Sequence, residues 1–288
     1  MTRARHIRED GTEIIHRLEG PADAPALVLT NGLTTDTGFW RYLWPGWARD
    51  YRVLMWDLPG HGESGPARTR GSATMEGAAV IIEELMDAAG MGRAVQIGWS
   101  TGSQVIFELY RRAPARCAAL VSLLGTAGRV LDTATLPLPG PVIDGLSRVM
   151  PPALFSASSR ALSRASDTRL GHFLGRRLGL LGPDASEPDV RAITRHMRTL
   201  HAPTVQIMLR SAQAQSASDL LPRLQVPLLI VSGDRDPFAP AETVATAMQR
   251  AAPDAELVRL PHGTHTALLD HATVIDGAVR SFLQRRVA

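Results

Sequence analysis

Residues 95–108 read Val-Gln-Ile-Gly-Trp-Ser-Thr-Gly-Ser-Gln-Val-Ile-Phe-Glu. The apolar run Ala94–Ile97 predicts a strand, and the run Ser103–Arg112 is compatible with a helix. Between them, Gly98-Trp99-Ser100-Thr101-Gly102 matches the pattern G-x-S-x-G. In a strand–turn–helix context this pattern is typical of a turn that presents a nucleophilic serine. We therefore predict that Ser100 is a catalytic nucleophile.

The residue types around Ser100 suit that role. A serine hydroxyl is a poor nucleophile until a neighbouring base removes its proton, so it has to be exposed and aimed. Gly98 and Gly102 have no Cβ, which lets the strand and the helix approach each other closely. The first turn of a helix also directs free N–H groups and the positive end of its dipole at the reacting oxygen. The alternative is an ordinary glycine-containing turn, because five-residue patterns recur by chance.

Strand and helix patterns alternate along most of the chain. Strands are predicted at Glu13–Leu18, Ala26–Thr30, Tyr51–Trp56, Ala94–Ile97, Ala118–Leu124, Pro227–Ser232 and Glu256–Leu260. Helices are predicted at Phe39–Ala48, Met75–Ala89, Ser103–Arg112, Ala241–Ala251 and Leu268–Arg285. Continuously apolar strands that alternate with helices indicate an α/β fold with a mostly parallel, doubly wound sheet. Ligands of such sheets bind beyond the carboxyl ends of the strands.

The alternation stops between about Gly128 and Ser218. This segment contains helical patterns at Ser158–Arg177 and Asp189–Gln213 and no clear strand. A structureless loop of about 90 residues inside a compact domain is improbable. We therefore predict a core of residues 1–128 and 219–288 and a helical cap insertion of residues 129–218 over the active edge of the sheet.

The composition excludes several classes of protein. All 31 basic residues among the 288 are arginine, and without lysine there is neither a Schiff-base lysine nor a Walker-type phosphate loop. The net charge of +3 comes from arginines scattered among acids, so nucleic-acid binding is not expected. No signal-peptide or membrane-spanning apolar run is found. The single cysteine, Cys117, fits a reducing compartment, and we expect a cytoplasmic protein.

Gly60-His61-Gly62-Glu63-Ser64-Gly65 has the spacing of a dinucleotide-binding loop. Such a loop has to open a helix and requires an acidic residue at the end of the next strand. Here Pro66 and a polar stretch follow instead, and Glu83 and Glu84 lie inside a predicted helix. We therefore predict that this loop binds no dinucleotide. For the protein as a whole we expect neither a cofactor nor a metal.

A nucleophilic serine needs a base, and the base needs a carboxylate that fixes its tautomer. The strand Pro227–Ser232 leads into Asp234 and Asp236, and the strand Glu256–Leu260 leads into His262 and His265. Serine, aspartate and histidine therefore follow one another along the chain, each after a predicted strand. Because parallel strands end at the same edge of a sheet, we expect these side chains to meet there.

From about Glu13 to its C-terminus, the chain resembles the α/β-hydrolase-fold superfamily, in the branch with a helical cap. The segment Trp56-Asp57-Leu58-Pro59-Gly60-His61-Gly62-Glu63-Ser64 resembles the loop after the fourth strand of that family. The resemblance implies that Asp236, the second acid of Gly-Asp-x-Asp, is catalytic, and that His265 rather than His262 is the base. Asp132 is a weaker alternative for the acid.

The family places its first oxyanion-hole donor just after a His-Gly pair. Here the pair is Asn31-Gly32, a departure that leaves the packing of this loop open. The resemblance implies that the backbone N–H groups of Leu33 and Thr101 form the hole, because backbone donors do not depend on the side chain.

The resulting expectation is a serine hydrolase that cleaves a carboxylic ester, lactone or thioester through an acyl-enzyme on Ser100, with a small acyl-containing molecule as its substrate. Three alternatives stay open: a ligand-binding receptor on the same fold, an acyltransferase or perhydrolase, and a C–C bond hydrolase that uses the same triad.

Overall fold

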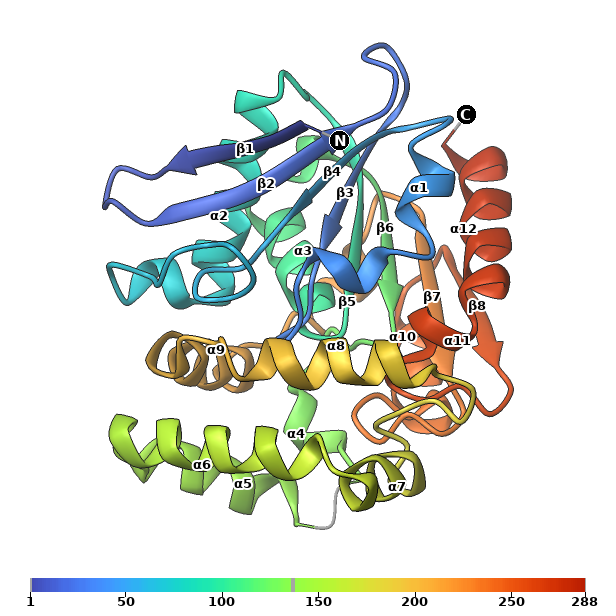
Figure 1. Ribbon diagram of the computed structural model, residues 1–288. Helices are drawn as coiled ribbons and strands as arrows, with labels where there is room; N and C mark the ends of the chain where they lie inside the picture. The colour runs from blue at the N-terminus through green and yellow to red at the C-terminus, as the bar shows by residue number, and fades with distance from the viewer. Residues whose placement is uncertain (1, 136–137, 288) are drawn as a thin grey trace.

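The computed structural model describes residues 2–135 and 138–287 and contains one eight-stranded sheet. The strand order is β1-β2-β4-β3-β5-β6-β7-β8 (Figure 1). Strands β3 to β8 run parallel, whereas β1 and β2 join one edge antiparallel. The bounds are β1 Thr2–Ile7, β2 Glu13–Glu19, β3 Ala26–Thr30, β4 Arg52–Trp56, β5 Ala94–Trp99, β6 Cys117–Leu123, β7 Leu228–Gly233 and β8 Ala255–Leu260. The mostly parallel α/β sheet predicted from the sequence is confirmed.

The side chains of the inner strands alternate between two apolar layers, one on each face of the sheet. Leu27 and Leu29 of β3 belong to the layer that includes Phe282, whereas Val28 between them belongs to the layer that includes Ile81. This alternation is what the two-residue period of a strand requires when both faces are covered. The continuously apolar runs in the sequence follow from it.

Helices cover both faces. α2 (Met75–Ala88), α3 (Thr101–Arg112) and α10 (Thr246–Ala251) contribute to one apolar layer, and α1 (Trp44–Trp47), α11 (Ala267–Asp270) and α12 (Ala272–Arg286) contribute to the other. Short turns of 3-10 helix occur at Thr37–Trp40, Gly71–Ala73, Pro114–Arg116 and Leu221–Arg223, and a π-helical turn at Ala241–Ala245 precedes α10. Among the described residues, no helix has the length and hydrophobicity that a membrane crossing requires.

Between β6 and β7 the described residues form helices and no strand. The α-helices are α4 Val130–Thr133, α5 Gly140–Val149, α6 Pro152–Ser166, α7 Arg169–Arg177, α8 Glu187–Met197 and α9 Ala202–Ala214. Figure 1 shows α4 to α9 gathered beyond the carboxyl ends of the strands.

The predicted helix Ser158–Arg177 is broken, because the Thr168 side chain caps the start of α7. The predicted helix Asp189–Gln213 is also broken, because His201 caps α9 and Pro203 lies in its first turn.

Two further sequence predictions are wrong in detail. The predicted helix Phe39–Ala48 is a 3-10 turn followed by α1, because Asp36 caps the first turn and Pro45 starts the second. No strand is predicted over residues 2–7, yet these residues form β1. β1 is a partly exposed edge strand that carries Arg3, Arg5 and His6, so it lacks the apolar alternation by which a strand is recognised.

Candidate active site

Ser100 lies at the turn between β5 and α3 in a strained backbone conformation, with φ 55° and ψ −124°. Its N–H donates to the carbonyl of Leu123 over 2.9 Å, which ties the turn to β6. A Cβ at Gly98 would lie 2.3 Å from the Gly102 oxygen, and a Cβ at Gly102 would lie 2.4 Å from the Thr30 oxygen. Both glycines are therefore required by close backbone contacts, and the strand–turn–helix prediction agrees with the structure.

Two buried hydroxyls brace this turn from below. Ser122 Oγ donates to Ser103 Oγ over 2.9 Å, and Ser103 Oγ donates to the Gly98 carbonyl over 3.0 Å. Both serines are fully buried. Neither serine can be recognised from the sequence, because a serine inside an apolar strand or helix has no distinctive spacing.

The structure brings Ser100, His265 and Asp236 together at the carboxyl edge of the sheet. His265 Nε2 lies 2.9 Å from Ser100 Oγ. His265 Nδ1 lies 3.0 Å from both carboxylate oxygens of Asp236. Asp236 is 2% exposed, and its Oδ1 accepts hydrogen bonds from the N–H groups of Phe238 and Ala239. These bonds hold the carboxylate in one orientation toward the imidazole.

The alternative acids and base lie elsewhere. Asp234 accepts a hydrogen bond from Arg259. Asp132 is about half exposed and accepts a hydrogen bond from Gln213 Nε2 over 2.7 Å. His262 is an exposed residue with φ 60° in the tight turn after β8. None of these three side chains has a hydrogen bond to Ser100 or His265 within the described part of the chain.

Aromatic rings flank the His265 imidazole. The ring centroids of Trp99 and Phe238 lie 5.0 Å and 4.6 Å from the imidazole centroid. The Trp99 Nε1–H group also donates to the His265 carbonyl over 3.1 Å. Trp99, the residue before the serine, therefore positions the backbone of the loop that carries His265, residues 261–266, called the histidine loop below.

The loop after α7 contacts the histidine loop directly. The His265 N–H donates to the Gly179 carbonyl over 3.1 Å, and the Gly182 N–H donates to Thr266 Oγ1 over 2.9 Å. Gly179 has φ 72°, and a Cβ on it would lie 2.2 Å from the Arg235 oxygen. The helical insertion therefore contacts the loops that carry both the acid and the base.

One of the two backbone N–H groups expected to form an oxyanion hole already donates a hydrogen bond within the protein. The Leu33 N–H already donates to Thr101 Oγ1 over 2.8 Å. Asn31, which replaces the family's histidine, is 1% exposed and fixes the loop by two hydrogen bonds. Its Nδ2 donates to the Trp56 carbonyl over 3.2 Å, and its Oδ1 accepts from Trp40 Nε1. Asn31 therefore ties the loop after β3 to β4 and to the turn that contains Trp40.

The Gly-rich loop after β4 is a structural turn that opens no helix. Asp57 accepts hydrogen bonds from the N–H groups of Thr37 (2.8 Å) and Glu63 (3.1 Å). Its burial raises the pKa of the Asp57 carboxyl, and these bonds act against that rise. Burial also lowers the pKa of His61 to about 4, so this histidine is neutral at pH 7 and lies inside the protein.

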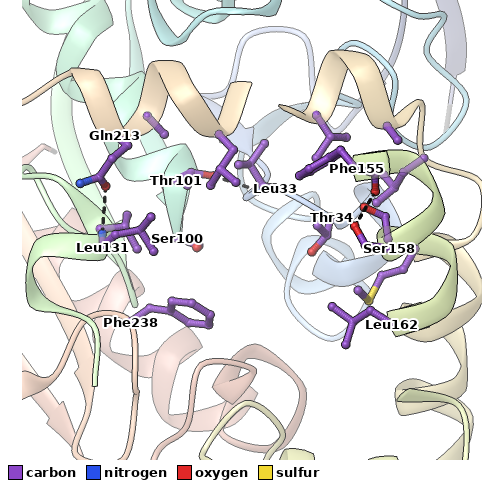
Figure 2. A pocket seen from close by; sticks show the side chains of 18 of the residues that line it. Leu33, Thr34, Ser100, Thr101, Leu131, Phe155, Ser158, Leu162, Gln213 and Phe238 are labelled. Carbon is purple, nitrogen blue, oxygen red and sulfur yellow. Dashed lines mark hydrogen bonds between the residues drawn. The ribbon is translucent and has the colours of Figure 1, made fainter. Parts of the chain in front are cut away.

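A cavity of about 510 Å³ lies between the sheet edge and the helical insertion. Ser100 and His265 line it on the core side, and residues of α4, α6, α8 and α9 line it on the other. Figure 2 shows Ser100, Thr101 and Phe238 near Leu131 and Gln213, with Phe155, Ser158 and Leu162 of α6 across the cavity. Most of the lining side chains are apolar, and such a cavity suits an acyl chain.

Comparison with known proteins gives the same family. The family model described as alpha/beta hydrolase fold matches residues 25–272. A pimeloyl-[acyl-carrier protein] methyl ester esterase of Sodalis glossinidius is 29% identical over 221 residues, which cover 76% of this chain and 78% of the relative.

Two other similar proteins are also hydrolases by name. A 2-hydroxy-6-oxononadienedioate/2-hydroxy-6-oxononatrienedioate hydrolase of Burkholderia vietnamiensis is 26% identical. The aligned region covers 97% of this chain and 94% of the relative. The crystal structure of a hydrolase from Pseudomonas aeruginosa PA01 superposes with a TM-score of 0.76 at 25% identity, over 98% of each chain. The chain therefore belongs to the alpha/beta hydrolase fold family.

Proposed function

We propose that this protein is a serine hydrolase that cleaves a carboxylic ester through an acyl-enzyme on Ser100. The observation that carries the proposal is the hydrogen-bonded chain from Ser100 Oγ through His265 to the buried carboxylate of Asp236. The names of the relatives support it, because they include ester hydrolases.

The geometry supports an ordered proton transfer. His265 Nε2 takes the proton of Ser100 Oγ while that oxygen attacks the carbonyl carbon of the ester. Asp236 keeps the other ring proton on Nδ1 and stabilises the imidazolium. His265 then gives its proton to the departing alcohol, and the acyl group stays on Ser100. A water molecule that is deprotonated by His265 attacks the acyl-enzyme, and Ser100 is restored.

Hydrogen-bond donors at the start of α3 stabilise the negative charge that develops on the carbonyl oxygen. Each such donor supplies about 3 kcal/mol in enzymes of this kind. Lactones and thioesters react by the same steps, so the chemistry of the triad does not select among them.

Cleavage of a C–C bond next to a carbonyl is a second candidate function. The similarity to the Burkholderia vietnamiensis hydrolase favours it, because that similarity covers nearly all of both chains. Parallel assays of a 2-hydroxy-6-oxo dienoic acid and of a carboxylic ester separate the two functions, since C–C cleavage of the first yields two acids and hydrolysis of the second yields an acid and an alcohol.

We also propose a division into a core of residues 1–128 and 219–288 and a cap of residues 129–218. The described residues between β6 and β7 support this division, because they form the helices α4 to α9 and no strand. In this arrangement the core carries the reacting groups, and the cap supplies Phe155, Leu162 and Met197 to the apolar cavity. The cap then selects the acyl group of the substrate.

We propose a cytoplasmic location with a small acyl-containing molecule as substrate. Cys117 is a buried free thiol, and burial raises its pKa to about 12. One unreactive thiol and no possible internal disulfide suit a reducing compartment.

Hydrolysis of p-nitrophenyl esters with graded acyl chains tests the proposed function. We expect medium-length chains to react with higher kcat/KM than acetate, because they fill more of the apolar cavity. We also expect a fluorophosphonate probe to label Ser100, as mass spectrometry of the labelled peptide would show. Saturable ester binding without turnover or labelling would instead indicate a receptor. Products formed with added methanol would reveal acyl transfer.

Substitution of Gly179 tests whether the cap loop positions the base. Gly179→Ala places a methyl group against the Arg235 carbonyl at a positive φ, which should cost more than about 1 kcal/mol of stability. Because the Gly179 carbonyl accepts the His265 N–H, we also expect kcat to fall by at least about tenfold, as it does when catalytic geometry is disturbed.

Gly145→Ala is the matched control. Gly145 lies in α5, where a Cβ meets no atom within 4 Å, so this change should leave kcat unchanged and raise the thermal midpoint slightly. Unchanged kcat in Gly179→Ala would show that the cap loop does not position His265.

A further inference from the structure

Thr101, the residue after Ser100, has a hydroxyl whose hydrogen-bonding capacity is only partly used. Thr101 Oγ1 accepts the Leu33 N–H over 2.8 Å. A threonine hydroxyl also has one O–H to donate. Within residues 2–135 and 138–287, no hydrogen bond donated by this O–H is found. Thr101 is only 7% exposed, so an O–H without an acceptor is unfavourable there.

The place of this hydroxyl points to its missing acceptor. Thr101, Leu33 and Ser100 all line the cavity, and Figure 2 shows the Leu33–Thr101 hydrogen bond on the wall next to Ser100. A backbone N–H makes one strong hydrogen bond. The Leu33 N–H therefore reaches a substrate oxygen directly only if the Thr101 hydroxyl is displaced.

We propose that the hydroxyl of Thr101 is a donor of the oxyanion hole. The Leu33 N–H acts on the substrate through this hydroxyl, because it strengthens the hydrogen bond that the hydroxyl donates. When Ser100 Oγ bonds to the carbonyl carbon, the carbonyl π electrons move to its oxygen. That oxygen accepts hydrogen bonds from the Thr101 O–H and from the Thr101 N–H. Both donors keep their protons, and the charge returns to the carbonyl when the leaving group departs. This inference rests on the proposed ester hydrolysis.

The contact with Leu33 strengthens and orients this donor. A hydroxyl that accepts a hydrogen bond becomes a better donor, because hydrogen bonds in a chain polarise one another. In a helix, the threonine side chain divides between two χ1 rotamers, and the bond from Leu33 selects one of them. The donor is therefore in place before the charge develops, which is the condition for electrostatic stabilisation of a transition state.

Kinetics of Thr101→Val and Thr101→Ser test the proposal. Valine keeps the branched shape and removes the hydroxyl, so we expect kcat to fall about 10²-fold with KM nearly unchanged. Serine restores the hydroxyl, and we expect it to recover most of the loss. If circular dichroism shows that Thr101→Val does not fold, Thr101→Ala replaces it, with the same expected loss.

A trifluoromethyl ketone distinguishes an oxyanion donor from a residue that merely anchors the loop. This inhibitor forms a tetrahedral adduct with the serine, and the adduct carries the oxyanion. We expect its Ki to rise in Thr101→Val by the same factor by which kcat/KM falls. If Thr101 had only a structural role, Thr101→Val would lower the thermal midpoint and raise KM, and Ki would rise only by the same factor as KM.

Two results would overturn the proposal. Unchanged kcat in Thr101→Val would mean that the hydroxyl is a bystander, and higher kcat would mean that it blocks the Leu33 donor. Both results presuppose that the wild-type protein hydrolyses esters. A wild-type protein that neither turns over esters nor reacts with a fluorophosphonate would instead refute the proposed function itself.

Discussion

Ser100→Ala should lower ester turnover by about 10⁴- to 10⁶-fold, because it removes the atom that forms the covalent intermediate. The remaining rate would come from binding and from the oxyanion donors, which do not need the serine oxygen. Initial rates with the preferred p-nitrophenyl ester, together with a fluorophosphonate labelling assay, measure the effect. The variant should take up no label.

Folding should be almost unaffected by the loss of this hydroxyl. The interactions that hold the turn in place belong to the Ser100 backbone and to the Ser122 and Ser103 hydroxyls beneath it. Ser281→Ala, at an exposed position of α12, is the matched control for the same change of side chain. Ordinary turnover in a correctly folded Ser100→Ala protein would exclude Ser100 as the nucleophile.

His265→Ala should reduce kcat nearly as severely, by about 10⁴-fold or more, because the members of a triad act as one unit. Without the imidazole, no other group among the described residues is hydrogen-bonded to Ser100 Oγ to accept its proton. Steady-state kinetics of the purified variant measure the loss. Fluorophosphonate labelling should slow as well, since the serine remains but is no longer activated.

His262→Ala is the matched control for the base, three residues earlier in the same loop. His262 is exposed and has no hydrogen bond to the three reacting side chains in the described structure, so kcat should stay close to that of the wild type. The pair Asp236→Asn and Asp234→Asn makes the same comparison for the acid. If His262→Ala were the damaging change and His265→Ala the mild one, the assignment of the base would be wrong.

Much of the fold could be predicted from the sequence because its inner strands are buried on both faces. Ala26–Thr30 and Leu228–Gly233 are apolar enough to be recognised without knowledge of their neighbours. The meeting of Ser100, Asp236 and His265 follows from topology, since each residue comes after a strand and parallel strands end at one edge. The resemblance to the family was needed to choose Asp236 over Asp234.

Features that depend on tertiary contacts could not be predicted. β1 pairs through its backbone at the sheet edge, and its polar side chains give no sign of the pairing. The bond from Leu33 to Thr101 joins residues 68 positions apart, and the sequence gives no sign that the Thr101 side chain accepts the Leu33 N–H. The breaks between the helices of the insertion depend on caps such as Thr168, whose sequence signal is weak inside an amphipathic run.

The hydrogen bonds that join His265 to Gly179 and Thr266 to Gly182 have a bearing on protein engineering. A chimaera that takes the helical insertion from one relative and the sheet from another treats the two parts as modules. Here the transplanted insertion would also have to reproduce Gly179, a residue with positive φ that contacts Arg235 and His265. A transplanted insertion of suitable shape that lacks the hydrogen bond to the His265 N–H would leave the general base poorly anchored, whichever substrate it admits.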